Sequence, residues 1–167
     1  MFAIFRATLY FALFVGFILI CFPARVLAWV GIAHPAHTGF AQVTGALIGS
    51  VGLLVAFWCV AAFATLGKGT PAPFDPPRRL VVRGPYRFVR NPMCMGAALA
   101  LAGGACFYAS FWLLAYAAAL FLTCYLFVVF YEEPHLRRTF GEEYEVYCRA
   151  VPRWRPCLPV RGPRLRN

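Results

Sequence analysis

Residues 93–131 read MCMGAALALAGGACFYASFWLLAYAAALFLTCYLFVVFY, a stretch of 39 residues without a charged side chain. A single α-helix of that length would extend about 58 Å, whereas the hydrocarbon core of a bilayer is only about 30 Å thick. Two membrane-spanning helices joined by a tight turn near residues 108–112 fit the stretch better. We therefore predict a helical hairpin with spans over residues 92–108 and 112–131.

Two more apolar runs precede the hairpin, at residues 7–22 and 42–66. The second contains 25 uncharged residues, which is long enough to cross a bilayer. The first is followed by Val26-Leu27-Ala28, which resembles a signal-peptidase site, but Arg6 alone is a thin basic region for a signal peptide. We expect the first run to be an uncleaved anchor, which brings the predicted spans to four.

The composition excludes a soluble globular domain. Of the 167 residues, 62% are hydrophobic and 13% are charged, and the mean hydropathy is +0.68. Soluble domains carry about 25% charged residues, and a chain this short cannot bury so much apolar surface in one core. Disorder is excluded because disordered chains lack apolar residues. The sequence predicts an all-α integral membrane protein with a single domain over residues 1–167.

The formal net charge is +10, and the basic residues gather mainly at residues 68–90 and 137–166. Membrane topology explains these clusters, because cytoplasmic loops are enriched in Lys and Arg. With loop 67–91 and tail 132–167 on the cytoplasmic side, only Arg25 faces the other side. We expect both termini and the active site on the cytoplasmic side of a bacterial inner membrane, and no nucleic-acid partner.

The tail beyond residue 131 differs from the spans. Thr139 followed by Glu142 is typical of a capping box at the start of a helix. Apolar residues recur at helical spacing between charged ones, at Leu136, Phe140, Tyr144, Tyr147 and Val151. This pattern predicts an amphipathic C-terminal helix at the membrane interface.

The seven cysteines and three histidines show no spacing typical of metal ligands. Most of the cysteines lie inside apolar runs, where a thiol behaves as a small hydrophobic group. The sequence therefore supports neither a disulfide framework nor a metal site.

Two polar clusters flank the hairpin, Arg87-Phe88-Val89-Arg90-Asn91-Pro92 before it and Glu132-Glu133 after it. Asn91 is a natural N-cap, and Pro92 suits the first position of the next helix. Because the two helices are antiparallel, we expect Asn91 beside Glu132. Arg90 and the helix N-terminus would bind a carboxylate, and a glutamate would bind an ammonium. The head of S-adenosylmethionine would satisfy both, although simple anchoring at the membrane interface explains the same residues.

The segment GPYRFVRNPMCMG at residues 84–96 resembles the G-P-Y-x-x-x-R-[HN]-P-x-Y-x-G segment of isoprenylcysteine carboxyl methyltransferase-like membrane proteins, a pattern that phospholipid methyltransferases share. Glu132-Glu133, FGEEY at residues 140–144, Tyr147 and Val151-Pro152 are similar to the E-E…F-G-x-x-Y-x-x-Y…V-P ending of that family. The resemblance covers about residues 80–156. Cys94 stands where the family has tyrosine, and Asn91 replaces the histidine of the eukaryotic prenyl-cysteine enzymes, so the acceptor stays open.

Members of this family are helical membrane enzymes that use S-adenosylmethionine. The resemblance therefore implies a methyltransferase that uses this cofactor on a lipophilic or membrane-borne carboxylate, amine or thiol. We expect Asn91 and Glu132 to be catalytic, with Glu132 as the base where the acceptor carries a proton. The cofactor site would comprise Tyr86, Arg87, Arg90, Asn91, Pro92, Gly96, Glu132, Glu133, Tyr144, Tyr147 and Arg153.

Two other functions stay open. An NADPH-dependent membrane reductase is one, because sterol reductases resemble this family near the C-terminus, and a non-enzymatic membrane scaffold is the other. The oligomeric state is open as well, since Gly45, Gly49 and Gly52 suit close helix packing within one chain or between chains.

Overall fold

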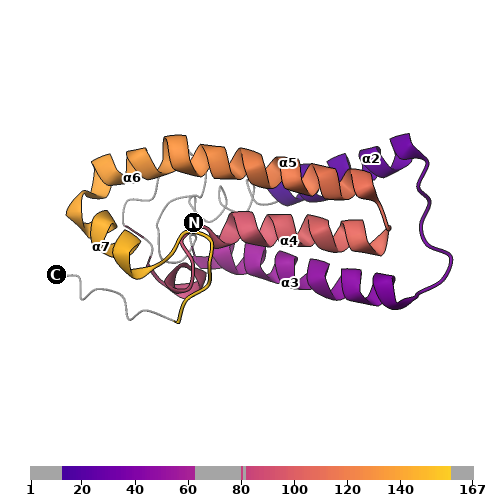
Figure 1. Ribbon diagram of the computed structural model, residues 1–167, viewed down its shortest axis with the longest axis horizontal. Coiled ribbons are helices and arrows are strands. Elements are labelled where there is room, and N and C mark those ends of the chain that lie inside the picture. The colour runs from indigo at the N-terminus through magenta and orange to yellow at the C-terminus, as the bar shows by residue number, and fades with distance from the viewer. Residues whose placement is uncertain (1–12, 63–79, 81, 159–167) are drawn as a thin grey trace.

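The computed structural model describes residues 13–62, 80 and 82–158, and among these residues it contains helices and no strand (Figure 1). The all-helical fold predicted from the sequence is confirmed. In chain order the elements are η1 (Phe14–Cys21), α2 (Phe22–Val30), α3 (Phe40–Ala62), η3 (Gly84–Arg87), α4 (Pro92–Phe107), α5 (Phe111–Phe127), η4 (Val128–Glu132), α6 (Glu133–Phe140) and α7 (Glu142–Ala150).

The predicted hairpin is formed by α4 and α5, which are joined by the short turn at residues 108–110. Ser110 stabilises the turn, because its hydroxyl oxygen accepts a hydrogen bond from the N–H of Leu113 at 3.3 Å. Figure 1 shows α4 lying between α5 and α3. The second helix of the hairpin does not stop at residue 131, since it continues through η4 and α6 to Phe140.

Two helical stretches are long and apolar enough to cross a membrane, Phe40–Ala62 and Phe111–Phe140. The stretches Gly16–Val30 and Pro92–Phe107 are apolar but shorter. Parts of the predicted topology lie outside the described residues, namely residues 7–12 of the first run, 63–66 of the second, 67–79 and 81 of the loop and 159–167 of the tail.

The helix that contains the first apolar run continues past residue 22, through α2 to Val30. Pro23 lies at the junction of the π-helical segment η1 with α2, inside the continuous helix, and its missing N–H removes one backbone hydrogen bond there. The helix ends at Gly31, which adopts the left-handed conformation with φ 75° and so allows the chain to turn.

Glycines bring α3 and α4 into close contact within the chain. A Cβ atom on Gly52 would collide with the backbone nitrogen of Ala100, and one on Gly103 would collide with the backbone nitrogen of Gly49. A Cβ on Gly96 would lie 2.9 Å from the carbonyl oxygen of Gly52. Gly45 and Gly52, which suited packing within or between chains, therefore serve packing within one chain.

The predicted Thr139–Glu142 capping box is wrong, and the tail forms two helices where the sequence predicts one. The tail forms α6 and α7, which meet at Gly141 with φ 52°, and the hydroxyl of Thr139 donates to the carbonyl of His135 inside α6 at 2.9 Å. The apolar stripe is also covered by the protein itself, since Tyr144, Tyr147 and Val151 form a buried cluster with Val82 of the incoming loop. Only a chain reversal at a glycine allows α7 to fold back onto that loop.

Candidate functional site

Residues 151–157, here called the C-terminal strap, bind the segment that leads into α4. The N–H of Arg90 donates to the carbonyl of Pro152 at 3.0 Å, and the N–H of Cys157 donates to the carbonyl of Phe88 at 2.9 Å. These backbone bonds hold the strap alongside residues 88–90. The two polar clusters of the sequence and the tail thus meet at one end of the helical bundle.

Glu133 lies at the centre of this end and is 5% exposed. Its Oε1 accepts from Arg153 Nε at 2.7 Å and from Arg90 Nη1 at 3.1 Å, while its Oε2 accepts from Arg153 Nη2 at 2.8 Å. The hydrogen bond to Glu133 raises the pKa of Arg153 above its ordinary value. Glu133 therefore links the start of α4 to the strap through two guanidinium groups.

Arg90 carries hydrogen-bonding capacity beyond its bond to Glu133. Its Nη1 also donates to Cys148 Sγ at 2.8 Å. Its Nε is buried without a hydrogen-bond partner among the described residues, and the same holds for Trp154 Nε1 in the strap. Because a buried donor without a partner costs free energy, these two atoms indicate a place where an acceptor group would be stabilised.

Asn91 and Pro92 open α4, as the sequence predicts, but Asn91 does not act as a side-chain cap. It occupies the N-cap position, and its side chain makes no capping hydrogen bond, while Pro92 lies in the first turn. Both residues are buried. The side-chain amide of Asn91 and the N-terminal end of α4, with its partial positive charge, therefore stand beside Arg90.

Glu132 has a different environment from Glu133. It is partly buried, and it forms no hydrogen bond or ion pair with any described residue. Burial raises the pKa of Tyr86 well above its usual value, and the charge of Glu132 adds to this effect. Asn91 and Glu132 are not hydrogen-bonded to each other. The two clusters are joined instead by the ion pair between Arg90 and Glu133, the sequence neighbours of Asn91 and Glu132.

The three predicted tyrosines hold the loop and the tail together. The hydroxyl of Tyr147 donates to the carbonyl of Tyr86 at 2.8 Å, and all three side chains are buried. Burial raises the pKa of Tyr144 and of Tyr147, so both phenols stay neutral donors at neutral pH. Arg87 is partly buried in η3, and Gly96 lies at the contact with α3.

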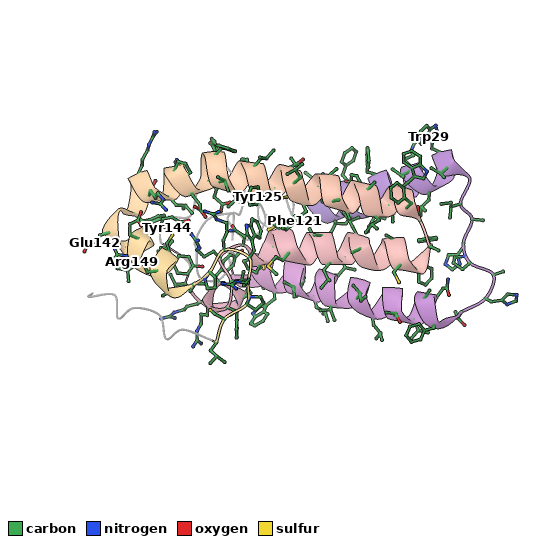
Figure 2. All side chains as sticks on the ribbon, in the orientation of Figure 1. Trp29, Phe121, Tyr125, Glu142, Tyr144 and Arg149 are labelled. Atoms are coloured by element: carbon green, nitrogen blue, oxygen red, sulfur yellow. The ribbon has the colours of Figure 1, made fainter. Side chains whose placement is uncertain are left out.

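Sequence reasoning missed an aromatic cluster beside the ion pairs. The ring of Trp154 lies 5.0 Å from that of Phe121 and 5.9 Å from that of Tyr125. Figure 2 shows Phe121 and Tyr125 on α5, with Tyr144 on the folded-back α7. The spacing of Phe121 and Tyr125 places them on one helix face, but nothing in the sequence indicates that Trp154 packs against it. No group of three His, Cys, Asp or Glu side chains suited to a metal ion occurs among the described residues.

Comparison of the chain with known protein families gives one match. The model of the family described as phospholipid methyltransferase matches residues 40–143, which is more than half of the chain. The matched region contains both polar clusters and the hairpin between them. No curated protein and no solved structure shows significant similarity to the chain.

Proposed function

Because the chain belongs to the phospholipid methyltransferase family, a family of membrane methyltransferases, we propose that it transfers a methyl group from S-adenosylmethionine to a lipophilic acceptor in the bilayer. The observation that carries the proposal is the meeting of Arg90, the N-terminus of α4 and two adjacent glutamates at one end of the bundle. A cationic donor group next to carboxylates suits a ligand with an amino-acid head.

The residues at this end fit that cofactor. Arg90 Nε is a buried donor without a described partner, and the first turn of α4 presents backbone N–H groups, so a carboxylate has partners here. The carboxylate of Glu132 has no hydrogen-bond or ion-pair partner among the described residues, so it can bind the ammonium of the ligand. Trp154 offers an aromatic face and a buried N–H donor.

When bound, S-adenosylmethionine supplies a methyl carbon whose bond to sulfur breaks as the lone pair of the acceptor forms the new bond, leaving S-adenosylhomocysteine. The protein orients the two reactants and excludes water. If the acceptor carries a proton, Glu132 accepts it. The side-chain amide of Asn91 makes no capping hydrogen bond, so it can donate one to a bound reactant.

We also propose a topology of four spans, with the site and both termini on the cytoplasmic side. The exposed apolar faces of α3 and α5 then contact lipid, including Leu47 and Leu54 on α3 and Leu122 on α5. The acceptor reaches the site from the bilayer. The strap and α7 lie at the membrane surface.

The test is a ligand titration of the purified protein in nanodiscs with S-adenosylmethionine, S-adenosylhomocysteine and NADPH. We expect saturable binding of the first two, weakened about tenfold or more in Arg90→Ala because a charge-assisted hydrogen bond is lost. Arg138→Ala removes an exposed arginine from α6 and serves as the matched control. Incubation of the protein with methyl-labelled S-adenosylmethionine and membrane lipids then identifies the acceptor.

Two results would contradict the proposal. Binding of NADPH alone would assign the protein to the membrane reductases. A folded protein that binds none of the three ligands would be a scaffold.

A further inference from the structure

The end of the bundle opposite the candidate site carries an exposed aromatic seam, formed by Phe22 and Trp29 of α2 with Trp112 and Tyr116 of α5. The rings of Trp29 and Trp112 lie 6.1 Å apart, edge to face, and those of Phe22 and Tyr116 lie 4.8 Å apart. Trp29 is 80% exposed and Trp112 is 51% exposed. Figure 2 shows Trp29 at the end of the molecule remote from α7. Exposed tryptophans at the end of a membrane helix are typical of the lipid headgroup layer.

Arg25 lies beside this seam. It follows Phe22 by three positions and precedes Trp29 by four, so all three side chains leave α2 on the same side. Its side chain is exposed, and it forms no ion pair or hydrogen bond with any described residue. Of the lysines and arginines that the structure describes, it is the only one at this end of the bundle. Arg25 therefore brings a positive charge to an aromatic surface.

The described part of the chain offers no counter-charge for Arg25. Every Asp and Glu in it lies between residues 132 and 145. Trp112 and Glu132 belong to the same continuous helix and are separated along it by about 30 Å. Salt screens charges beyond about 8 Å, and an arginine without a counter-charge is costly in a bilayer. The anion that balances Arg25 therefore comes from its surroundings, where the headgroup layer holds phosphate.

We propose that Arg25, Trp29 and Trp112 bind the phosphate of a phospholipid headgroup in the leaflet opposite the candidate site. The planar guanidinium binds two phosphate oxygens at once. Each tryptophan adds an indole N–H donor and an apolar ring that suits the headgroup layer. The bound lipid fixes the depth of α2 and α5 in that leaflet. The inference rests on the proposed four-span topology and is independent of methyl transfer.

Tryptophan fluorescence in nanodiscs tests the seam directly. Substitution of Trp58 and Trp154 by phenylalanine leaves Trp29 and Trp112 as the only tryptophans of the chain. Two probe lipids have the same acyl chains, brominated near the headgroup, and bromine quenches tryptophan only at short range. One probe is phosphatidylglycerol, and the other is a glycosyl diacylglycerol, which has no phosphate. Each is added at low mole fraction to a bilayer of unbrominated glycosyl diacylglycerol.

We expect brominated phosphatidylglycerol to quench the more strongly, with an enrichment at the seam of about fivefold. Arg25→Gln is expected to abolish this preference, and Arg25→Lys, which keeps the charge, is expected to retain part of it. The matched control is Arg138→Gln, which removes an exposed arginine at the opposite end and should leave the preference unchanged. Thermal unfolding in the same nanodiscs verifies that each variant is folded.

The outcomes separate the lipid site from the topology on which it rests. Equal quenching by the two probes in the wild type, or a preference that survives Arg25→Gln, would overturn the lipid site and leave the topology standing. Loss of the preference in Arg138→Gln as well would also overturn it, because the overall charge of the protein would then attract the lipid. If neither probe quenched the two tryptophans, the seam would lie outside the bilayer, and the proposed topology would fail with the site.

Discussion

Arg153 forms a two-point ion pair with Glu133, with Nε 2.7 Å from Oε1 and Nη2 2.8 Å from Oε2. Glu133 begins α6, whereas Arg153 lies in the strap beyond α7. The pair therefore closes the tail onto the end of the long helix. Arg90 joins the same carboxylate from the start of α4, so one buried side chain connects three segments.

This arrangement predicts that removing Glu133 lowers the free energy of unfolding more than removing Arg153 does. Glu133→Ala leaves the arginine side chain of Arg90, 12% exposed, without its counter-charge, and we expect a loss of about 3–5 kcal/mol of unfolding free energy. Arg153→Ala costs less, because Glu133 keeps Arg90. The control is Glu145→Ala, which breaks the exposed pair with Arg137 and should cost about 1 kcal/mol or less. Denaturant unfolding in micelles measures all three, and equal losses for Glu133→Ala and Glu145→Ala would contradict the prediction.

The contact between α3 and α4 predicts opposite effects for two neighbouring glycines. In Gly52→Ala the new methyl meets the backbone of Ala100, so α4 must shift, and we expect a loss of about 1–3 kcal/mol. In Gly49→Ala the new methyl lies 3.6 Å from the carbonyl oxygen of Ala100, an ordinary contact, and we expect a gain of up to about 1 kcal/mol from helix propensity. Thermal unfolding in detergent compares the two variants. Equal effects would place the interface elsewhere on α3.

From the burial of Tyr147 we predict that the folded state loses stability at high pH. A free tyrosine has a pKa of about 10, and burial raises the pKa of Tyr147 above that value. Because the folded-state pKa is the higher one, the contribution of Tyr147 is complete below about pH 10 and is lost as the pH rises toward the folded-state value. Unfolding free energies measured from pH 8 upward should fall above about pH 10. We expect a smaller fall in Tyr147→Phe, and an identical fall in both proteins would refute this origin.

The same hydrogen bond predicts a cost at neutral pH. Tyr147→Phe leaves the carbonyl of Tyr86 without the hydroxyl that lies 2.8 Å away, and we expect a loss of about 1–3 kcal/mol. Limited proteolysis of residues 151–157 should also accelerate, since the loop and α7 are no longer tied together. A variant as stable and as protease-resistant as the wild type would show that this bond does not hold the tail.

The hairpin predicts a thiol pair between its helices. The thiols of Cys94 in α4 and Cys124 in α5 lie close enough to interact with each other. In a variant that keeps only these two cysteines, one equivalent of mercuric ion should bridge them and protect both from alkylation. Cys106, whose thiol donates to the carbonyl of Ala41 in α3, faces another helix. A variant with only Cys106 and Cys124 should gain no such protection, and protection there would disprove the helix register.

Much of the site was predictable because membrane-length apolar runs constrain the chain. A charge-free stretch too long for one span must turn, and the turn brings Arg90 and Glu133 to the same end. Other contacts at this end join residues that are distant in sequence. Gly96 belongs to a motif but contacts Gly52 of α3, and Trp154 lies on Phe121 although their separation along the chain carries no periodic signal.

The sequence by itself determined the all-helical class, the hairpin and the convergence of its two polar clusters, since these follow from apolar length and from backbone hydrogen bonding along each helix. Only the tertiary structure decided that the tail folds back at Gly141 and that Glu133, rather than Glu132, is paired with arginines. The physical reason is the direction in which each side chain leaves the helix. Neighbouring side chains on a helix point about 100° apart, and their partners come from a strap that reaches them only after the chain reverses.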